Sequence, residues 1–271
     1  MSGGLRAIDQ PALFRALMAG LIASAWAILW FWSDSPYGRY LDHGRWTDVG
    51  VAGAICRAIP AGEIAVPALL YATAWLMMIS AMMLPTTIPL LEIFRRITAG
   101  RPDAGRLVAA VVFGYVAVWF GFGLFAHAAD WLLHAAAGRI PWLVANGWAA
   151  AVAVLGAAGL FQFSALKYRC LDKCRTPLGF VVERWRGRNP AREALRLGIE
   201  HGAFCVGCCW ALMLLMFVVG TASPGWMLAL SAVMAAEKNL PGGQRLSMPL
   251  GVALIAWAAV IVLLNAAPGA G

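Results

Sequence analysis

The sequence predicts an all-α integral membrane protein, a polytopic bundle of about seven transmembrane helices. Three observations agree on this fold class. The 271 residues are 62% hydrophobic and only 13% charged, about half the charge of an ordinary soluble domain. The apolar residues form long runs instead of scattered core positions. Basic residues concentrate in alternate connections between those runs, as they do in cytoplasmic loops.

The apolar runs divide the chain into expected spans of roughly 20 residues, the length that crosses a bilayer. The sixth run is the shortest. In chain order the runs are Ala16–Trp32, Ile64–Pro85, Leu107–His127, Trp142–Phe163, Gly202–Gly220, Pro224–Ala236 and Leu246–Leu264. Little remains for a separate soluble domain, so we expect residues 1–271 to form a single integral membrane domain.

The first two runs carry their own boundary signals. Arg6 and Arg15 precede the first run, but no A-x-A-like cleavage site follows it, so we expect an uncleaved helix. The second run reaches Pro85 and Pro89, which remove backbone donors and predict a kinked or terminated helix. Broken helices in membranes line functional sites or are simply tolerated, and both interpretations stay open.

The distribution of positive charge predicts the orientation. Alternate segments hold 17 of the 21 Lys and Arg residues, and this excess marks the cytoplasmic side. We therefore expect a cytoplasmic N-terminus, a periplasmic C-terminus and a basic cytoplasmic loop at about residues 167–200. Within it Asn189 and Pro190 would begin a short interfacial helix, and a solvated basic loop without a helix is the alternative. Topology and anionic lipid then explain the net charge of +8, and no nucleic-acid partner is expected. The expected location is the bacterial inner membrane.

Five of the six cysteines form two clusters at one membrane face. Cys170 and Cys174 follow the fourth run, and Cys205, Cys208 and Cys209 lie in the first turns of the fifth. Their spacings present the thiols on one side of a helix. Thiolates are the ligands of Zn(II), Cu(I) and iron–sulfur clusters. The two clusters therefore predict a metal site, with a thiol redox relay and plain packing as the alternatives.

Copper(I) is the favoured ion and zinc the second. Cys205, Cys209, Met213 and Met216 fall on one stripe of the fifth run, and thioether beside thiolate favours the softer ion. Met213 is accordingly a candidate ligand, although methionine is also a flexible gap filler in apolar helices. Cytoplasmic thiols stay reduced, which disfavours lasting disulfides there. Cys56 lies in an outer loop and receives no role.

Charged residues flank the cysteine clusters. Glu237 and Lys238 end the sixth run near the height of the cysteines. They could pair or support the site, and a helix terminus that snorkels to the interface is the commoner explanation. Four basic residues surround the first cysteine pair and would offset the negative charge of a thiolate site; they are Lys167, Arg169, Lys173 and Arg175.

A weaker candidate metal site lies at the opposite face. His127, Asp130 and His134 would stack on one side of a continuing helix, and imidazole and carboxylate bind divalent metals. Asp42 and His43 of the preceding outer loop could approach them. The alternative is an interfacial helix whose polar face contacts water.

Four motifs stand in order along the chain. They are Ala81–Thr86 (AMMLPT), Leu166-Lys167 with Cys170-Leu171 and Cys174-Arg175-x-Pro177, Gly202 with Cys205–Met213 (CVGCCWALM), and Glu237-Lys238. Together they resemble a bacterial family of integral membrane proteins, catalogued as a domain of unknown function and described as predicted metal-binding. The resemblance covers roughly the second to the seventh run. It implies a multi-span membrane protein with a cysteine-rich metal site and no established reaction.

The chain departs from that family's pattern at two places. Ala222-Ser223 stand where a Met-Asn pair usually follows the fifth run, so any ligand role of that Met is absent. Ser164-Ala165 replace the usual Thr-Pro before Leu-Lys, which predicts a less kinked end of the fourth run. The five clustered cysteines are all present.

The sequence thus predicts a membrane protein that binds or transfers a soft metal, or serves metalloenzyme assembly. The expected ligands are Cys170, Cys174, Cys205, Cys208, Cys209 and Met213. A membrane thiol-disulfide oxidoreductase and an accessory subunit of a larger complex are the alternatives. No catalytic triad, phosphate-binding loop or metalloprotease motif is present, which disfavours an enzyme. The expected partners are the lipid bilayer and a metalloprotein or membrane complex.

Overall fold

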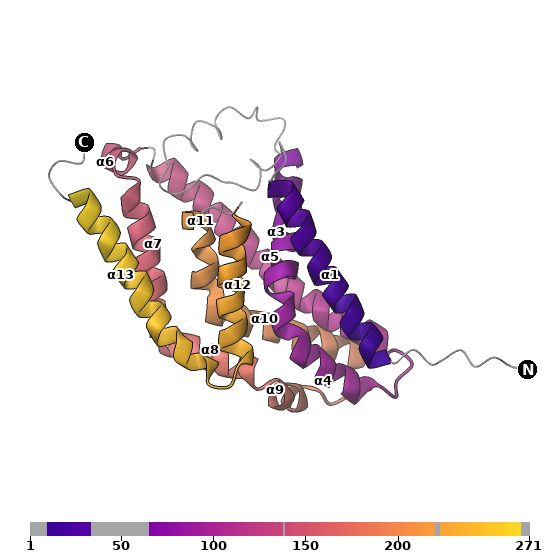
Figure 1. Cartoon of the computed structure of the whole chain (residues 1–271). Coiled ribbons are helices and arrows are strands. Elements are labelled where there is room, and N and C mark those ends of the chain that lie inside the picture. The colour runs from indigo at the N-terminus through magenta and orange to yellow at the C-terminus, as the bar shows by residue number, and fades with distance from the viewer. Residues whose placement is uncertain (1–9, 34–64, 138, 220–222, 267–271) are drawn as a thin grey trace, which may run out of the picture.

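A computed structural model describes residues 10–33, 65–137, 139–219 and 223–266. These residues form helices packed into one bundle (Figure 1). No β-strand occurs within the described ranges, so the predicted all-α class is confirmed. Asp42, His43 and Cys56 lie outside the described residues.

The helices are named as in Figure 1. In chain order they are α1 (Gln10–Ser33), α3 (Ala65–Met82), η3 (Leu84–Thr87), α4 (Ile88–Thr98), α5 (Ala104–Ala137), α6 (Pro141–Ala145), α7 (Trp148–Phe161), α8 (Ala165–Arg175), α9 (Pro177–Arg184), α10 (Pro190–Leu214), α11 (Met216–Val219), α12 (Pro224–Asn239), η4 (Gly243–Leu246) and α13 (Ser247–Ala266).

The candidate membrane spans number four to six among the described residues. Four come from α1, α5, α10 and α13, and two bent helix pairs raise the number to six. These long apolar helices indicate a membrane protein. The expected sixth span, Pro224–Ala236, forms α12, which has 16 residues and falls short of the roughly 20 that a bilayer requires. This is why the structure has fewer spans than the expected seven.

Two pairs of helices are bent: α3 with the segment that follows it, and α7 with α8. The second run bends by 47° between α3 and the segment that starts at Leu84, as Pro85 and Pro89 predict, since neither proline donates a backbone hydrogen bond. The fourth run bends by 63° between α7 and α8 without a proline. Ser164 is extended there, and its hydroxyl accepts a hydrogen bond from the backbone of Lys167, which starts a new helix. Loss of the family's proline therefore does not straighten the chain.

Helix α10 is the central helix of the bundle. In the most apolar stretch of the span Pro190–Val218, which begins with α10, 67% of the residues are buried, compared with 11% in that of α1. Its start at Asn189 and Pro190 was predicted, but the expected short interfacial helix is wrong. The helix continues for 25 residues because Leu197, Gly198 and other small or apolar residues bury it against α5. The expected basic loop at residues 167–200 is consequently mostly helical, in α8, α9 and the start of α10.

Small residues allow α5 and α10 to approach closely. A Cβ added at Gly198 would collide with the backbone of Val111, and one at Gly114 would lie 2.5 Å from the carbonyl oxygen of Leu195. Close contact through glycine is common between membrane helices. It brings Tyr115 of α5 within reach of the cysteines on α10.

Candidate metal centre

The two cysteine clusters meet at the contact between α8 and α10. The Sγ atoms of Cys174 and Cys208 are 4.0 Å apart. The Cys205 thiol also interacts with those of Cys174, Cys208 and Cys209. All five described cysteines are free thiols, and only Cys174 is more than slightly exposed. The structure therefore brings together two cysteine clusters that are distant in the sequence.

Cys170 reaches this group past Gly207. A Cβ at Gly207 would lie 2.6 Å from the Cys170 Sγ, so glycine leaves room for the sulfur. On α10 itself, the thiols of Cys208 and Cys209 both donate to the carbonyl oxygen of Cys205, at 3.1 and 2.8 Å. These local hydrogen bonds hold the two side chains back along the helix.

The ammonium of Lys238 lies inside the group of sulfur atoms. Its Nζ is 2.9 Å from the Cys205 Sγ, 3.7 Å from the Cys209 Sγ and 4.0 Å from the Met83 Sδ. The side chain is buried, as is that of Glu237. The expectation that these two residues snorkel to the interface is therefore wrong: the end of α12 packs inside the bundle, where a cation must find electron-rich partners.

The proline-broken segment after α3 forms the facing wall. The Met83 Sδ lies 4.0 Å from the Cys209 Sγ, and the hydroxyl of Thr86 is 3.4 Å from the Lys238 Nζ. Tyr115 contacts the Cys205 Sγ at 3.0 Å and donates to the carbonyl oxygen of Met83 at 3.2 Å. The break thus supplies a sulfur atom and a hydroxyl to the site. We call the five cysteines, Met83 and Lys238 the sulfur centre.

A second buried lysine lies beside the sulfur centre. The Lys167 Nζ donates to both carboxylate oxygens of Glu237, at 2.8 and 2.9 Å, and to Gln162. Ser247 donates to the same carboxylate at 2.6 Å. All four side chains are at most 2% exposed. Lys167 was expected to offset thiolate charge, but its charge is paired with a carboxylate here.

Arg175 is likewise engaged away from the thiols. It donates to the carbonyl oxygen of Glu237 and, at 2.7 Å, to that of Leu240. These contacts cap the C-terminal end of α12. They attach α12 to α8, so the helix carrying Lys238 and the helix carrying Cys170 and Cys174 are fixed relative to each other.

The donor atoms of the sulfur centre are chemically suited to a soft ion. Thiolate and thioether sulfur bind Cu(I) well, whereas hard cations prefer oxygen. Among the described residues, no group of three or more His, Cys, Asp or Glu side chains is arranged so that it could hold a metal ion. The Lys238 ammonium instead lies among the thiols, and Met83 faces them. Ion binding would therefore require the ammonium to move aside.

The other predicted ligands lie elsewhere. Met213 is fully buried one turn beyond Cys209 on α10, inside the same apolar cluster. His127 is partly buried on α5. Asp130 and His134 continue that helix, but their side chains lie outside the described part of the structure. The outer metal site therefore stays a prediction.

Sequence reasoning missed Met83 of the sulfur centre and Tyr115, which contacts that centre. Met83 directly follows Met82, so the two do not share a helical face, and the break after α3 places the Met83 Sδ 4.0 Å from the Cys209 Sγ. Tyr115 lies on α5 at the same level as Cys205, and an isolated tyrosine in an apolar run carries no sequence signal. Lys238 did have one, since a lysine next to a glutamate in an apolar segment is costly unless paired.

Comparison with known proteins identifies the family. A family model described as PpoB2, a copper chaperone, matches residues 72–261, about seven tenths of the chain and all of the sulfur centre. No curated protein and no solved structure matches. The copper description agrees with the metal-binding part of the resemblance seen in the sequence. The chain therefore belongs to the PpoB2 family of copper chaperones.

Proposed function

We propose that this protein is a membrane-integral copper chaperone that holds Cu(I) on the sulfur centre and passes it to a metalloprotein. The observation that carries the proposal is the convergence of Cys174, Cys205, Cys208 and Cys209 around one buried position. Cys170 completes the proposed ligand set of the sulfur centre, and Met213, one turn beyond Cys209 on α10, is proposed to receive the ion from these thiols. A bacterial inner membrane is the proposed location, supported by the apolar helices and the basic alternate segments.

Charge supports Cu(I) over zinc. We take the copper form to have two thiolates: together with the Lys238 ammonium they carry one net negative charge, which a monovalent ion neutralises. A divalent ion at the same position would leave a net positive charge away from water, and an uncompensated buried charge is costly. Lys238 therefore favours the monovalent ion even after it moves aside from Cys205 and Cys209.

The proposal is tested by measuring copper and zinc in purified protein reconstituted in lipid nanodiscs. We expect copper in the wild-type protein and its loss in the Cys205→Ser/Cys208→Ser/Cys209→Ser variant. Cys56→Ser is the matched control, since Cys56 belongs to neither cluster, and it should keep its copper. Equal metal content in the wild type and the triple variant would refute the proposal.

A thiol-disulfide oxidoreductase is the second candidate, favoured by the 4.0 Å between the Cys174 and Cys208 sulfur atoms. Such a pair could close to a disulfide with a small movement. Thiol alkylation separates the two functions. A metal centre gains reactive thiols when a Cu(I) chelator is added, whereas a disulfide pair gains them only with a reductant.

A further inference from the structure

Most methionines of the chain gather in one place. Seven of the eleven are at most 5% exposed and belong to the same core cluster. They are Met78, Met82, Met83, Met213, Met216, Met227 and Met234. They come from α3, its C-terminal break, α10, α11 and α12, so helices distant in the sequence bring their sulfur atoms to one interior region.

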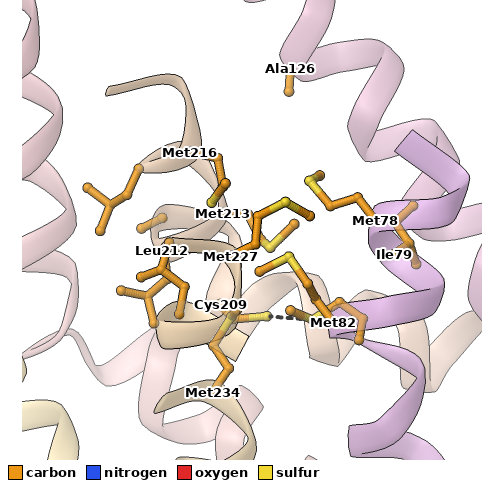
Figure 2. Packing of buried hydrophobic residues seen from close by; sticks show 14 of the residues in the cluster. Met78, Ile79, Met82, Ala126, Cys209, Leu212, Met213, Met216, Met227 and Met234 are labelled. Atoms are coloured by element: carbon orange, nitrogen blue, oxygen red, sulfur yellow. Dashed lines mark hydrogen bonds between the residues drawn. The ribbon is translucent and has the colours of Figure 1, made fainter. Parts of the chain in front are cut away.

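Four of these side chains converge. Figure 2 shows Met78 and Met82 of α3, Met213 of α10 and Met227 of α12 turned towards one space in the centre of the bundle. We call these four the methionine group. Cys209 lies next to it (Figure 2), and the Sδ of Met83, which follows Met82 in the chain, is 4.0 Å from the Cys209 Sγ. The methionine group therefore lies beside the sulfur centre in the interior of the bundle (Figure 2).

Plain packing explains part of this arrangement, because methionine fills irregular gaps. It does not require the sulfur atoms of three helices to face one another, since leucine would fill an apolar core with fewer rotamers to fix. Facing thioethers are instead a recognised donor set for Cu(I), and they offer nothing to hard divalent ions. The convergence therefore has a chemical use that matches the family.

We propose that the methionine group is a second site for a soft monovalent ion, distinct from the sulfur centre. Met82, Met213 and Met227 supply three neutral thioether donors, and Met78 lies beside them. The thioethers carry no charge, so the ion keeps its own positive charge in an apolar region, which makes binding weaker than on thiolates. A weaker adjacent site suits transfer of the ion through the bundle and not its storage.

The direction of the sulfur atoms agrees with this role. Cys205, Cys209, Met213 and Met216 succeed one another along α10 and α11. Ala126 of α5, one residue before His127, lies beyond Met78 on the side away from Cys209 (Figure 2). The methionine group therefore extends the proposed copper route from the α8 end of the bundle towards the C-terminal half of α5. The inference rests on the proposed function only for the identity of the ion.

The test is the anaerobic titration of the nanodisc-reconstituted protein with Cu(I) against a chromogenic Cu(I) chelator. The wild type should bind a tight equivalent and a weaker one. Met82→Leu/Met227→Leu should lose the weaker equivalent alone, because leucine matches methionine in volume and keeps the core packed. The matched control is Met18→Leu/Met248→Leu, which removes two methionines outside the cluster and should keep both equivalents.

Retention of both equivalents by Met82→Leu/Met227→Leu would overturn the inference, as would a wild type that binds one equivalent only. Cys205→Ser/Cys209→Ser separates this inference from the proposed function. If that variant loses the tight equivalent and keeps the weaker one, with sulfur neighbours in its copper X-ray absorption spectrum, the methionine site is supported. If it loses both equivalents, no separate site exists and the inference fails.

Discussion

Two buried lysines lie at the two sides of one helix end and meet different partners. Lys167 faces the carboxylate of Glu237, with Gln162 and Ser247 completing its hydrogen bonds. Lys238, the neighbour of that glutamate, faces Cys205 and other sulfur atoms. Within the described residues no carboxylate forms an ion pair with Lys238. Around Lys167 the positive charge is balanced by the Glu237 carboxylate. Around Lys238 there is a cation but, among the described residues, no carboxylate that balances it.

This difference indicates that the two lysines have different roles, one structural and one in ion binding. A lysine and a glutamate paired in the interior form a neutral unit that resists change, because removing either partner leaves a bare charge. Thiols can exchange a proton for a metal ion, so the partners of Lys238 can bind an ion, whereas the carboxylate beside Lys167 already has its cation. We therefore assign helix attachment to the Lys167–Glu237 pair and ion binding to the surroundings of Lys238.

The largest expected effect on stability comes from breaking the Lys167–Glu237 pair. Lys167→Met leaves the buried Glu237 carboxylate without its cation and should destabilise the protein by about 3–5 kcal/mol. Detergent-induced unfolding of the purified protein measures this change. The double variant Lys167→Met/Glu237→Gln is the control and should recover much of the loss. A single variant as stable as the double would contradict the structural role of the pair.

The second-largest expected effect is on the choice between zinc and copper at the sulfur centre. Lys238→Met removes the cation that disfavours a divalent ion, so the ratio of bound zinc to bound copper should rise by about tenfold, equivalent to ~1.4 kcal/mol. Metal analysis after exposure to both ions gives the ratio. Lys173→Met is the control, since Lys173 pairs with Glu183 at the surface. An unchanged ratio of zinc to copper would show that Lys238 does not determine which metal binds.

A smaller effect is expected from the tyrosine of the sulfur centre. Tyr115→Phe deletes the hydroxyl that contacts the Cys205 Sγ and the carbonyl oxygen of Met83, and should cost roughly 0.5–1.5 kcal/mol of stability. It should also weaken Cu(I) binding a few-fold, measured by chelator competition. Tyr168→Phe on α8 is the control. Equal copper affinity in both variants would show that Tyr115 only packs.

The smallest effect belongs to an exposed pair. The hydrogen bond from Arg101 lowers the pKa of the Asp103 carboxyl, so any stabilisation is present above the ordinary pKa of aspartate and disappears as the pH falls through the lowered value. Both groups are in water, where salt screens them. Arg101→Ala should therefore leave the unfolding midpoint unchanged at neutral pH and moderate salt. A clear fall would mean that this pair behaves like the buried one.

The apolar runs predicted the helical class because hydrophobicity over some 20 residues reports directly on the solvent of a helix. The spacing of Cys205, Cys208 and Cys209 also predicted that their thiols share one side of α10. The shortness of the sixth run already marked α12 as the weakest expected span, but its apolar composition resembles that of the other runs and did not show that the helix ends inside the bundle. Its burial depends on neighbours distant in the chain.

The pairing of the charged residues beside the site could not be predicted from the sequence, for a similar reason. Two lysines and one glutamate allow several pairings, and only the bend at Ser164 places Lys167 beside Glu237. The break after Met82 likewise turns Met83 to Cys209, although a continuous helix would direct it elsewhere. Helix breaks re-aim single side chains, and their angles are set by tertiary contacts and not by local composition.

Copper X-ray absorption spectroscopy of the Cu(I)-loaded wild-type protein tests the central claim most directly. The account predicts a first coordination shell made of sulfur alone, because the Lys238 Nζ contacts the sulfur atoms of Cys205, Cys209 and Met83, with the Thr86 hydroxyl as its one oxygen contact among the hydrogen bonds of the described residues. A shell dominated by nitrogen or oxygen would contradict the account, and so would a sulfur shell that persists unchanged after Cys205, Cys208 and Cys209 are replaced by serine.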